Sequence, residues 1–339
     1  MRKLDFLVPV YNEGEEVVKP LLDSIALQQS VDFDDIGVIV CCDGGTTVLS
    51  EEFTKHYPFE VEFYMCEHEG VSATRNACLD HSKADYVCFC DADDLFMNAC
   101  GLYIIFREID HNGGFDTLTS VFVEETRTPD RKEIVYIDRQ MDSTFVHGKF
   151  HRRKYLLEKD IRFNPKLTIH EDSYFNILAQ NLTQKAKYCP TPFYLWKWRD
   201  ASVCRHDKDY ILKTYNNMLD SNDALVGEFI KRGHDDKANF YVGFMIFDAY
   251  YTMNKKEWID QTNKHYRDDV ENRFAEYYDK YKERWNILTE QEKMAVSNAV
   301  RTRSVNEGMP METLTIAQWL EHISEITKAN KTEDKEGEA

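Results

Sequence analysis

The sequence predicts an α/β protein in which a mixed, mostly parallel sheet is flanked by helices and followed by a C-terminal helical lobe. Three observations lead to this prediction. Short apolar runs alternate with helical patterns over the first 110 residues, which is the order that βαβ units produce. These runs lack the polar alternation of a strand with one solvated face. Beyond about residue 207, aromatic and aliphatic residues recur at helical spacing.

The first 110 residues are expected to form four buried strands with helices between them. Each apolar run has the length of a buried strand, and each intervening segment carries an apolar stripe. We predict strands at residues 4–10, 36–42, 61–66 and 86–90, and helices at residues 15–28, 48–57 and 71–81.

Residues 115–206 continue the same domain with a different pattern. Residues 116–125 and 133–138 predict a hairpin around the turn 127–130, which makes the sheet mixed. A helix is expected after Asp172, and two short strands at 186–189 and 193–199 are separated by Pro190 and Pro192. We therefore expect a domain over 1–206, a helical lobe over 207–330, and a charged, disordered tail over 331–339.

Composition excludes several classes of protein. The 339 residues include 42 basic and 60 acidic side chains, for a net charge of −18, which opposes broad attachment to phosphate backbones or anionic lipids. No run approaches the roughly 18 apolar residues of a membrane helix. The nine cysteines include no C-x-x-C pair, and Cys88 and Cys90 read as small buried hydrophobes. We expect a cytoplasmic protein without an integral membrane segment.

Polar residues follow three of the predicted strands. They are Tyr11-Asn12-Glu13, Asp43-Gly44-Gly45-Thr46 and Asp91-Ala92-Asp93-Asp94. Ligands of open parallel sheets bind at the carboxyl ends of the strands, so these clusters are expected to meet at one edge.

Asp91 and Asp93 are the candidate metal ligands. In extended chain, residues two apart point the same way, and two carboxylates suit a hard divalent cation such as Mg²⁺ or Mn²⁺. Such an ion would neutralise charge on a departing diphosphate. The alternative is a solvated turn or an N-cap for the following helix.

The segment Gly70–Asn76 opens a predicted helix whose N-terminus would attract phosphate. Arg75 would add a charged contact to that phosphate or brace the acidic site from behind. Ser72 has the ordinary alternative of capping the helix.

Asp172 stands beside Glu171 at the start of another predicted helix. A functional Asp here would act as the general base that removes a proton from an attacking hydroxyl. Its alternative role is that of a helix cap.

Taken together, these motifs resemble family 2 glycosyltransferases of the GT-A fold, which is Rossmann-like, and in particular the soluble, non-processive members. The resemblance covers about residues 1–205. It rests on Val8-Pro9-Val10-Tyr11-Asn12-Glu13, Asp43-Gly44-Gly45, Ser72-Ala73-Thr74-Arg75-Asn76, Asp91-Ala92-Asp93-Asp94, Gly148-Lys149-Phe150-His151-Arg152-Arg153, Glu171-Asp172 and Trp198-Arg199-Asp200-Ala201-Ser202.

The resemblance implies transfer of a sugar, with inversion, from a nucleotide-diphosphate donor, a UDP-sugar being the first choice. It also implies roles for individual residues. Pro9, Tyr11 and Glu13 would border the nucleoside, and Asp43 would bind the base. Arg75 would lie near the diphosphate, Asp91 would face ribose or sugar, and Asp93 would hold Mn²⁺ or Mg²⁺. Asp172 would be the catalytic base, and Glu171 would contact acceptor or sugar.

The sequence departs from the family pattern in two places. Cys42-Asp43-Gly44-Gly45 replaces the usual Asp-Asp-Gly-Ser, which removes a carboxylate and a hydroxyl from the region that recognises the donor. No Gln-x-x-Arg-Trp motif is present, which favours single-sugar transfer over processive synthesis.

The acceptor stays open between a glycan, a lipid, a protein and a nucleic acid base. Trp198 is the candidate for binding it, with Trp196, His147 and His151 beside it in the sequence pattern; packing is the alternative for all four. His206 is a candidate further metal ligand, for which a surface histidine is the preferred interpretation, and Arg152-Arg153-Lys154 is a basic patch or a solvated helix start. The helical lobe would serve acceptor binding or a homo-oligomer.

Two other functions remain open on the residues alone. A sugar nucleotidyltransferase would need a glycine-rich basic loop near the N-terminus, whereas residues 8–16 are acidic. A non-catalytic scaffold would bind the donor without turning it over.

Overall fold

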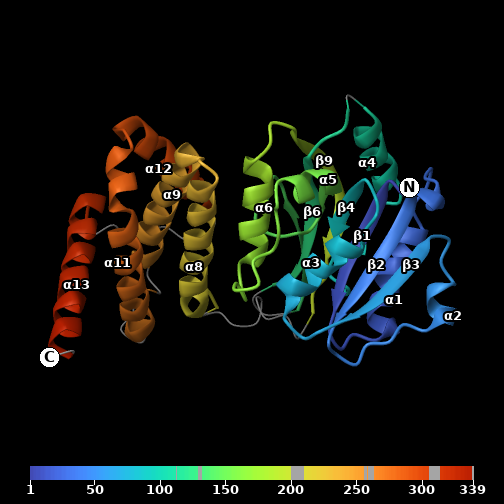
Figure 1. Cartoon of the computed structure of the whole chain (residues 1–339), viewed down its shortest axis with the longest axis horizontal. Coiled ribbons are helices and arrows are strands. Elements are labelled where there is room, and N and C mark those ends of the chain that lie inside the picture. The colour runs from blue at the N-terminus through green and yellow to red at the C-terminus, as the bar shows by residue number, and fades with distance from the viewer. Residues whose placement is uncertain are drawn as a thin grey trace. The chain divides into compact units, whose positions relative to one another are not determined.

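The computed structural model describes residues 1–111, 113–128, 132–199, 210–255, 258, 263–304 and 314–337, with the backbone alone for 302–304 and 331–337. The chain divides into two compact units, Met1–Ser202 and Val203–Ala339 (Figure 1). The domain boundary expected at residue 206 lies outside the described residues, as do Asp200, Ala201, Ser202 and His206.

Four parallel strands form the first half of the sheet in the N-terminal unit. They are β1 (Leu4–Val10), β2 (Ile36–Asp43), β3 (Glu60–Cys66) and β4 (Tyr86–Phe89), in the spatial order β3-β2-β1-β4. All four lie within two residues of the predicted bounds. The apolar runs are therefore parallel strands, as predicted.

The second half of the sheet is mixed. β8 (Lys149–Arg152) runs antiparallel to both β4 and β6 (Thr117–Arg127), and β6 pairs in parallel with β9 (Ala186–Trp196). β5 (Leu95–Phe96) pairs antiparallel with β9, and β7 (Ile134–Arg139) forms the predicted hairpin with β6. The prediction of a mixed sheet is confirmed.

One strand replaces the two that Pro190 and Pro192 were expected to separate. β9 passes through both prolines, and its register against β6 shifts between Ser120 and Phe122. Proline cannot donate a ladder hydrogen bond, so the strand absorbs both prolines at an irregular position instead of ending there.

Helices cover both faces of the sheet (Figure 1). Apolar residues of α1 (Glu15–Ala26) and α4 (Gly101–Asp110) pack on one face, whereas α6 (Glu171–Asn181) packs on the other through Phe175, which lies edge-on to Phe89 of β4. Further helical segments of this unit are α3 (Val71–His81), α5 (Arg153–Glu158), the short turn η1 (Phe33–Asp35) and α2, which is described next.

The helix expected over residues 48–57 is much shorter. α2 spans only Glu51–Thr54. The side chain of Ser50 caps it by accepting from the backbone N–H of Phe53, and Pro58 disfavours helical backbone at the preceding residue.

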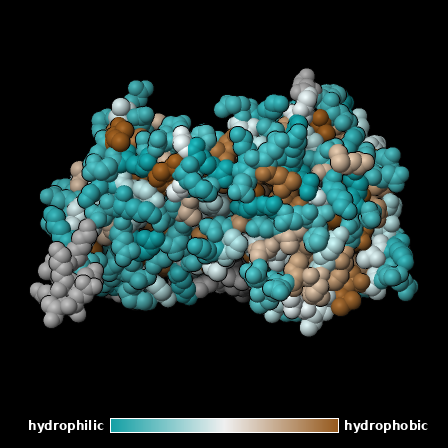
Figure 2. Space-filling view, in the orientation of Figure 1, coloured by the Kyte–Doolittle hydropathy of each residue, from teal (hydrophilic) through white to brown (hydrophobic). Residues whose placement is uncertain are grey.

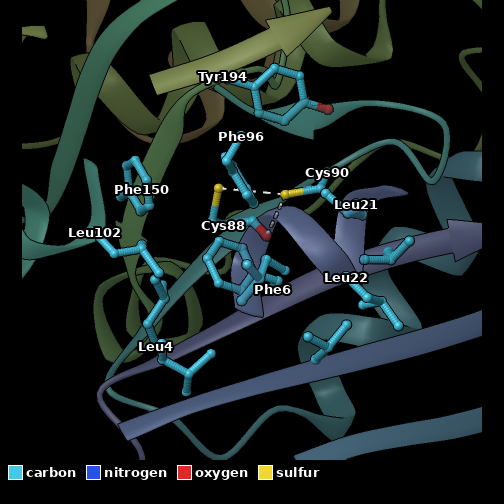
Figure 3. Close-up of a cluster of buried hydrophobic side chains, with 14 of the residues drawn as sticks. Leu4, Phe6, Leu21, Leu22, Cys88, Cys90, Phe96, Leu102, Phe150 and Tyr194 are labelled. Atoms are coloured by element: carbon cyan, nitrogen blue, oxygen red, sulfur yellow. Dashed lines mark hydrogen bonds between the residues drawn. The ribbon is translucent and has the colours of Figure 1, made fainter. Parts of the chain in front are cut away.

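The core beneath α1 and α4 is almost entirely apolar (Figure 3). Leu4 and Phe6 of β1 meet Leu21 and Leu22 of α1 there. Cys88 and Cys90 lie on the same face with their sulfur atoms 3.8 Å apart, and both are fully buried. They are small buried hydrophobes, as predicted.

The C-terminal unit is helical throughout its described residues. It contains α8 (Tyr210–Lys231), α9 (Asp235–Met253), α11 (Lys264–Ile287), α12 (Glu290–Ser304) and α13 (Ile316–Gly337). Most of the aromatic and aliphatic residues that recur at helical spacing in this region are buried, but Phe240 and Met294 are exposed. α13 continues through residues 331–337, where the sequence suggested a disordered tail. The lysine and glutamate residues of that segment are good helix formers, so the helix extends.

Hydrophilic side chains dominate the surface shown in Figure 2, and hydrophobic residues occur there in small separate groups. Among the described helices, none combines the length and the apolar character that spanning a membrane requires.

Candidate active site

A pocket of about 200 Å³ opens at the carboxyl ends of β1, β2 and β4. Val71 and Thr74 of α3 contribute to its wall. Six residues singled out from the sequence also line it: Pro9, Tyr11, Glu13, Asp43, Asp91 and Asp93. The structure thus brings together residues from three separate motifs at the edge of the sheet where ligands of this architecture bind.

Arg75 lies beside the pocket and binds three carboxylates. One terminal nitrogen donates to Glu171 Oε1 at 2.9 Å and to Asp172 Oδ1 at 2.7 Å, and the other donates to Asp91 Oδ1 at 3.0 Å. The guanidinium lies over the ring of Phe163, and only 4% of Arg75 is exposed. These contacts correspond to the bracing role of Arg75, and its contact with a phosphate stays a prediction.

The three carboxylates and their arginine do not titrate alike. Although burial opposes it, the charges of Asp172 and Asp91 raise the pKa of Arg75 above its ordinary value. Burial also raises the pKa of Asp91, but the charge of Arg75 outweighs this and leaves the pKa lower than usual. Asp172 behaves in the opposite way, because burial and the neighbouring Glu171 and Asp91 raise its pKa well above the ordinary value despite Arg75.

Asp172 is in the first turn of α6 and does not cap that helix. The N-cap position is His170, in left-handed backbone with φ of 63°, and no side chain makes a capping hydrogen bond there. The carboxylate of Asp172 points instead to Arg75. This geometry removes the capping alternative and leaves a partly buried carboxylate that shares Arg75 with the pocket residue Asp91.

Asp93 and Asp94 follow Asp91 with different surroundings. Asp93 forms an ion pair with Arg199 at 2.9 Å, and its pKa is raised by burial and by the charge of Asp91. Asp94 is fully buried and accepts from the hydroxyl of Tyr194 at 2.7 Å and the backbone N–H of Lys197 at 2.9 Å. Sequence reasoning assigned Asp94 no role, because its distant partners become visible only in the folded sheet.

Comparison with known proteins identifies the domain that carries this site. The model of the glycosyl transferase family 2 matches residues 5–166. Residues 5–166 form a glycosyl transferase family 2 domain.

Two curated relatives are similar to this chain. The minor teichoic acid biosynthesis protein GgaB of Bacillus subtilis is 22% identical over 257 residues, which are 71% of this chain and 28% of GgaB. The teichoic acid poly(glycerol phosphate) polymerase of Staphylococcus epidermidis is 25% identical over 257 residues, which are 68% of this chain and 34% of the polymerase. The match thus spans about a third of the length of these relatives.

Among solved structures, residues 1–349 of S. aureus TarS in complex with UDP superpose with a TM-score of 0.60 at 16% sequence identity. The match covers 91% of this chain and 92% of that structure, so it extends beyond the family 2 domain. This likeness shows the fold: a GT-A sheet domain with a C-terminal helical region.

The carboxylate of Asp43 forms hydrogen bonds with the loop that precedes α3. This carboxylate accepts from the backbone N–H groups of Glu69 and Gly70 at 2.9–3.1 Å, and His68 Nδ1 lies 3.1 Å away. The carboxylate therefore orders the loop before α3, and His68 in turn stacks on Tyr11 with ring centroids 4.8 Å apart.

The unusual Gly44-Gly45 pair has a steric explanation. A Cβ at position 45 would lie 1.4 Å from the carbonyl oxygen of Tyr11, and Gly44 has a φ of 69°. The serine that the family usually carries would not fit against Tyr11 here without a shift of the backbone.

No side chain caps the N-terminus of α3 in the structure. Its N-cap is Gly70, and Ser72 is buried with its hydroxyl directed at the carbonyl of Leu167 at 3.4 Å. The capping role suggested for Ser72 is therefore wrong, because the chain around Leu167 takes up the hydroxyl.

Several aromatic and basic candidates have structural partners. His147 and His151 are buried, and Trp196 packs against Phe145 and His147. Trp198 is half-buried, with the guanidinium of Arg127 6.0 Å from its ring centre.

The basic run Arg152-Arg153-Lys154 is not a patch of free charges. Arg152 and Arg153 donate to backbone carbonyls, including those of Gly113 and Leu79. Lys154 is exposed on α5 and pairs with Glu158 at 3.6 Å.

Proposed function

We propose that this protein transfers one sugar from a nucleotide-diphosphate sugar to an acceptor hydroxyl with inversion at the anomeric carbon. One observation carries the proposal. Asp172, from α6, and Asp91, from the end of β4, reach the same guanidinium from different elements. A base and a donor-binding carboxylate placed in this way suit a single displacement, in which the nucleophile and the leaving group occupy opposite faces of the sugar.

The pocket is the proposed donor site. Tyr11 is exposed and lines the pocket, together with Pro9 and Glu13. UDP is the ligand named for the S. aureus TarS structure, and on this basis we place a UDP-sugar first among the donors. Asp43 would act here by holding the loop 68–70 in place, with any contact to the base as an addition.

Asp91 and Asp93 would hold a divalent cation. Both carboxylates line the pocket, and oxygen donors suit Mg²⁺ and Mn²⁺. When bound, the ion supplies positive charge that stabilises the departing diphosphate. Arg199 neutralises Asp93 in the present structure, so the site accepts positive charge at this carboxylate.

Asp172 would be the general base. Its raised pKa makes the carboxylate more basic than an ordinary aspartate, which favours proton removal from the acceptor hydroxyl. Arg75 fixes the orientation of the carboxylate and keeps it beside Asp91. General-base catalysis of this kind contributes about 10²–10⁴-fold in rate.

For the acceptor we propose the hydroxyls of a polyol phosphate polymer. Support comes from the two relatives named above, whose names refer to teichoic acid and poly(glycerol phosphate).

The experiment combines the purified chain with Mn²⁺ or Mg²⁺, a panel of UDP-, GDP-, dTDP- and CMP-sugars, and poly(glycerol phosphate). Mass spectrometry of the polymer and release of the nucleotide are the readouts. The proposal predicts addition of single sugars from one donor, lost in Asp93→Ala and Asp172→Asn and retained in the surface control Glu158→Gln. Donor binding without transfer or nucleotide release would indicate a scaffold and overturn the catalytic assignment.

A further inference from the structure

The strand β7 forms an exposed edge of the sheet. Within the described residues it pairs with β6 alone. Sheets usually protect such an edge with charged residues, proline or a very short strand, because an apolar edge pairs with another chain. All six residues of β7 are exposed, and its first four are apolar, with 38–59% of each residue exposed: Ile134, Val135, Tyr136 and Ile137.

The turn of the hairpin establishes which backbone groups of β7 face away from β6. The backbone N–H of Thr128 donates to the carbonyl of Glu133 at 3.0 Å, so Glu133 faces β6. In an antiparallel pair this direction alternates from one residue to the next. The residues with odd numbers therefore bond to β6, and those with even numbers direct their N–H and C=O groups outward: Ile134, Tyr136 and Asp138.

These outward groups match those of a second copy of the strand. A two-fold axis at Tyr136 places this residue opposite Tyr136 of the second copy, and Ile134 opposite Asp138. Each of these facing pairs then exchanges two backbone hydrogen bonds, as in an ordinary antiparallel ladder. A shift by one residue would set outward groups against groups already bonded to β6.

The same register brings opposite charges together. Glu133 of one copy lies opposite Arg139 of the other, and the two-fold axis repeats this pair at the far end of the strand. Val135 and Ile137 face each other between the two charged pairs. A shift by two residues in either direction would set Glu133 opposite an uncharged residue, Ile137 or Met141. Arg139 is held in place by Glu124 of β6 at 2.5 Å.

We propose that β7 pairs with β7 of a second copy of this chain, which joins the two sheets edge to edge in a homodimer. A two-fold interface uses the same patch on both copies, so the patch has to be complementary to itself. β7 meets this condition in its backbone groups, its apolar side chains and its charges. The inference does not depend on the proposed function.

Sedimentation equilibrium of the full chain over a range of concentrations tests the dimer. Wild type should dimerise reversibly. Glu133→Arg sets two arginines opposite each other, and the dissociation constant should rise at least about 10-fold. Glu158→Arg makes the same change of charge at an exposed position of α5, and it should leave the dissociation constant unchanged.

Tyr136→Pro separates the pairing from the fold of the hairpin. Proline at an edge is tolerated where its N–H would face away from the neighbouring strand. The substitution therefore removes an outward N–H without removing a hydrogen bond to β6. A folded monomer is expected, with unchanged circular dichroism.

Amide hydrogen exchange at residue resolution tests the register in the unmodified chain. The amides of Ile134, Tyr136 and Asp138 should exchange more slowly at high protein concentration than at low concentration. The amides of Val135 and Ile137 should be protected at both concentrations. A wild type that is monomeric at every concentration would overturn the inference. A dimer unaffected by both Glu133→Arg and Tyr136→Pro would do the same, since it would use another surface. Failure of the proposed function shows separately, as absence of sugar transfer.

Discussion

Two arginines at opposite ends of the sheet each face three carboxylates, but their surroundings differ. Arg2, beside the start of β1, pairs with Asp5 at 2.8 Å, Glu60 at 2.5 Å and Glu62 at 2.8 Å. Arg75, beside the carboxyl end of β4, pairs with the acidic side chains of the pocket edge and of α6. Each cluster contains one arginine and three carboxylates, so the two clusters differ in the other hydrogen-bond donors that reach the carboxylates.

The carboxylates around Arg2 accept hydrogen bonds from further donors besides the arginine. Asp5 also accepts from the hydroxyl of Ser82 at 2.7 Å and from the backbone N–H groups of Lys83 and Ala84. Burial raises the pKa of Glu62, but Tyr64 and Arg2 outweigh it, so the pKa lies lower than usual. Carboxylates stabilised in this way hold the fold together at neutral pH.

Among the described residues, no further hydrogen-bond donor is seen for the carboxylates that bind Arg75, and the pKa of Asp172 is raised. The carboxylate of Asp172 therefore costs stability while it is ionised and gains from a bound ligand or proton. The comparison indicates what separates the two arginines. Where the carboxylates have further hydrogen-bond donors, as around Arg2, the cluster stabilises the fold. Where they lack them, as around Arg75, the cluster is suited to bind a ligand or a proton.

The largest effect is expected at Asp172. Asp172→Asn should reduce sugar transfer about 10²–10⁴-fold, because it removes the general base. Its free energy of unfolding should stay unchanged or rise, because the ionised carboxylate costs stability above its raised pKa. Steady-state rates and urea unfolding measure the two quantities. A loss of activity that merely follows a loss of folded protein would refute the role.

Replacing Arg75 should lower the stability of the protein more than any other of these substitutions. Arg75→Met leaves three carboxylates without a partner and is expected to lower the free energy of unfolding by about 3–5 kcal/mol. Arg75→Lys should recover only part of this, because one ammonium cannot reproduce the planar contacts to three acids. Denaturant unfolding gives both values, and full recovery by lysine would contradict the geometry.

Asp5→Asn should separate the two clusters. The loss of a charged partner of Arg2 is expected to cost about 1–3 kcal/mol of stability, with no change in turnover per folded molecule. The exposed pair of Lys154 and Glu158 supplies the control, since its removal should cost at most about 0.5 kcal/mol. If Asp5→Asn impaired turnover in fully folded protein, the division between the clusters would fail.

The pH dependence should also differ between the clusters. Activity requires ionised Asp172, so the rate should rise with pH through its raised pKa, with an acid limb above the ordinary aspartate range. Glu62 contributes stability that is lost as pH falls through its lowered pKa. A pH–rate profile beside a pH–stability profile tests both. An acid limb at or below pH 4 would contradict the raised pKa.

The sequence predicted the sheet and the pocket well because both follow from local patterns. Apolar runs gave the four parallel strands, and the residues after them gave the pocket. No local sequence pattern predicts that His147 lies beside Asp94. The antiparallel pairing of β8 with β4 brings the two residues together. The same holds for Tyr194, which reaches Asp94 across 100 residues of sequence.

The ends of elements were harder to predict for a related reason. Ser50 and Pro58 limited α2 through capping and backbone restriction, which an apolar stripe does not report. The contact of Arg75 with Asp172 could not be predicted from the sequence, because it forms only when α6 brings Asp172 to the arginine.

Calorimetric titration of UDP into the protein tests the central claim, that the carboxyl end of the sheet is a metal-assisted donor site. With Mn²⁺ present, UDP should bind to wild type and to Asp5→Asn, and binding should weaken at least about 10-fold in Asp91→Asn or after chelation of the metal. Equal binding of UDP in Asp91→Asn, or no binding to wild type with any metal, would contradict the account.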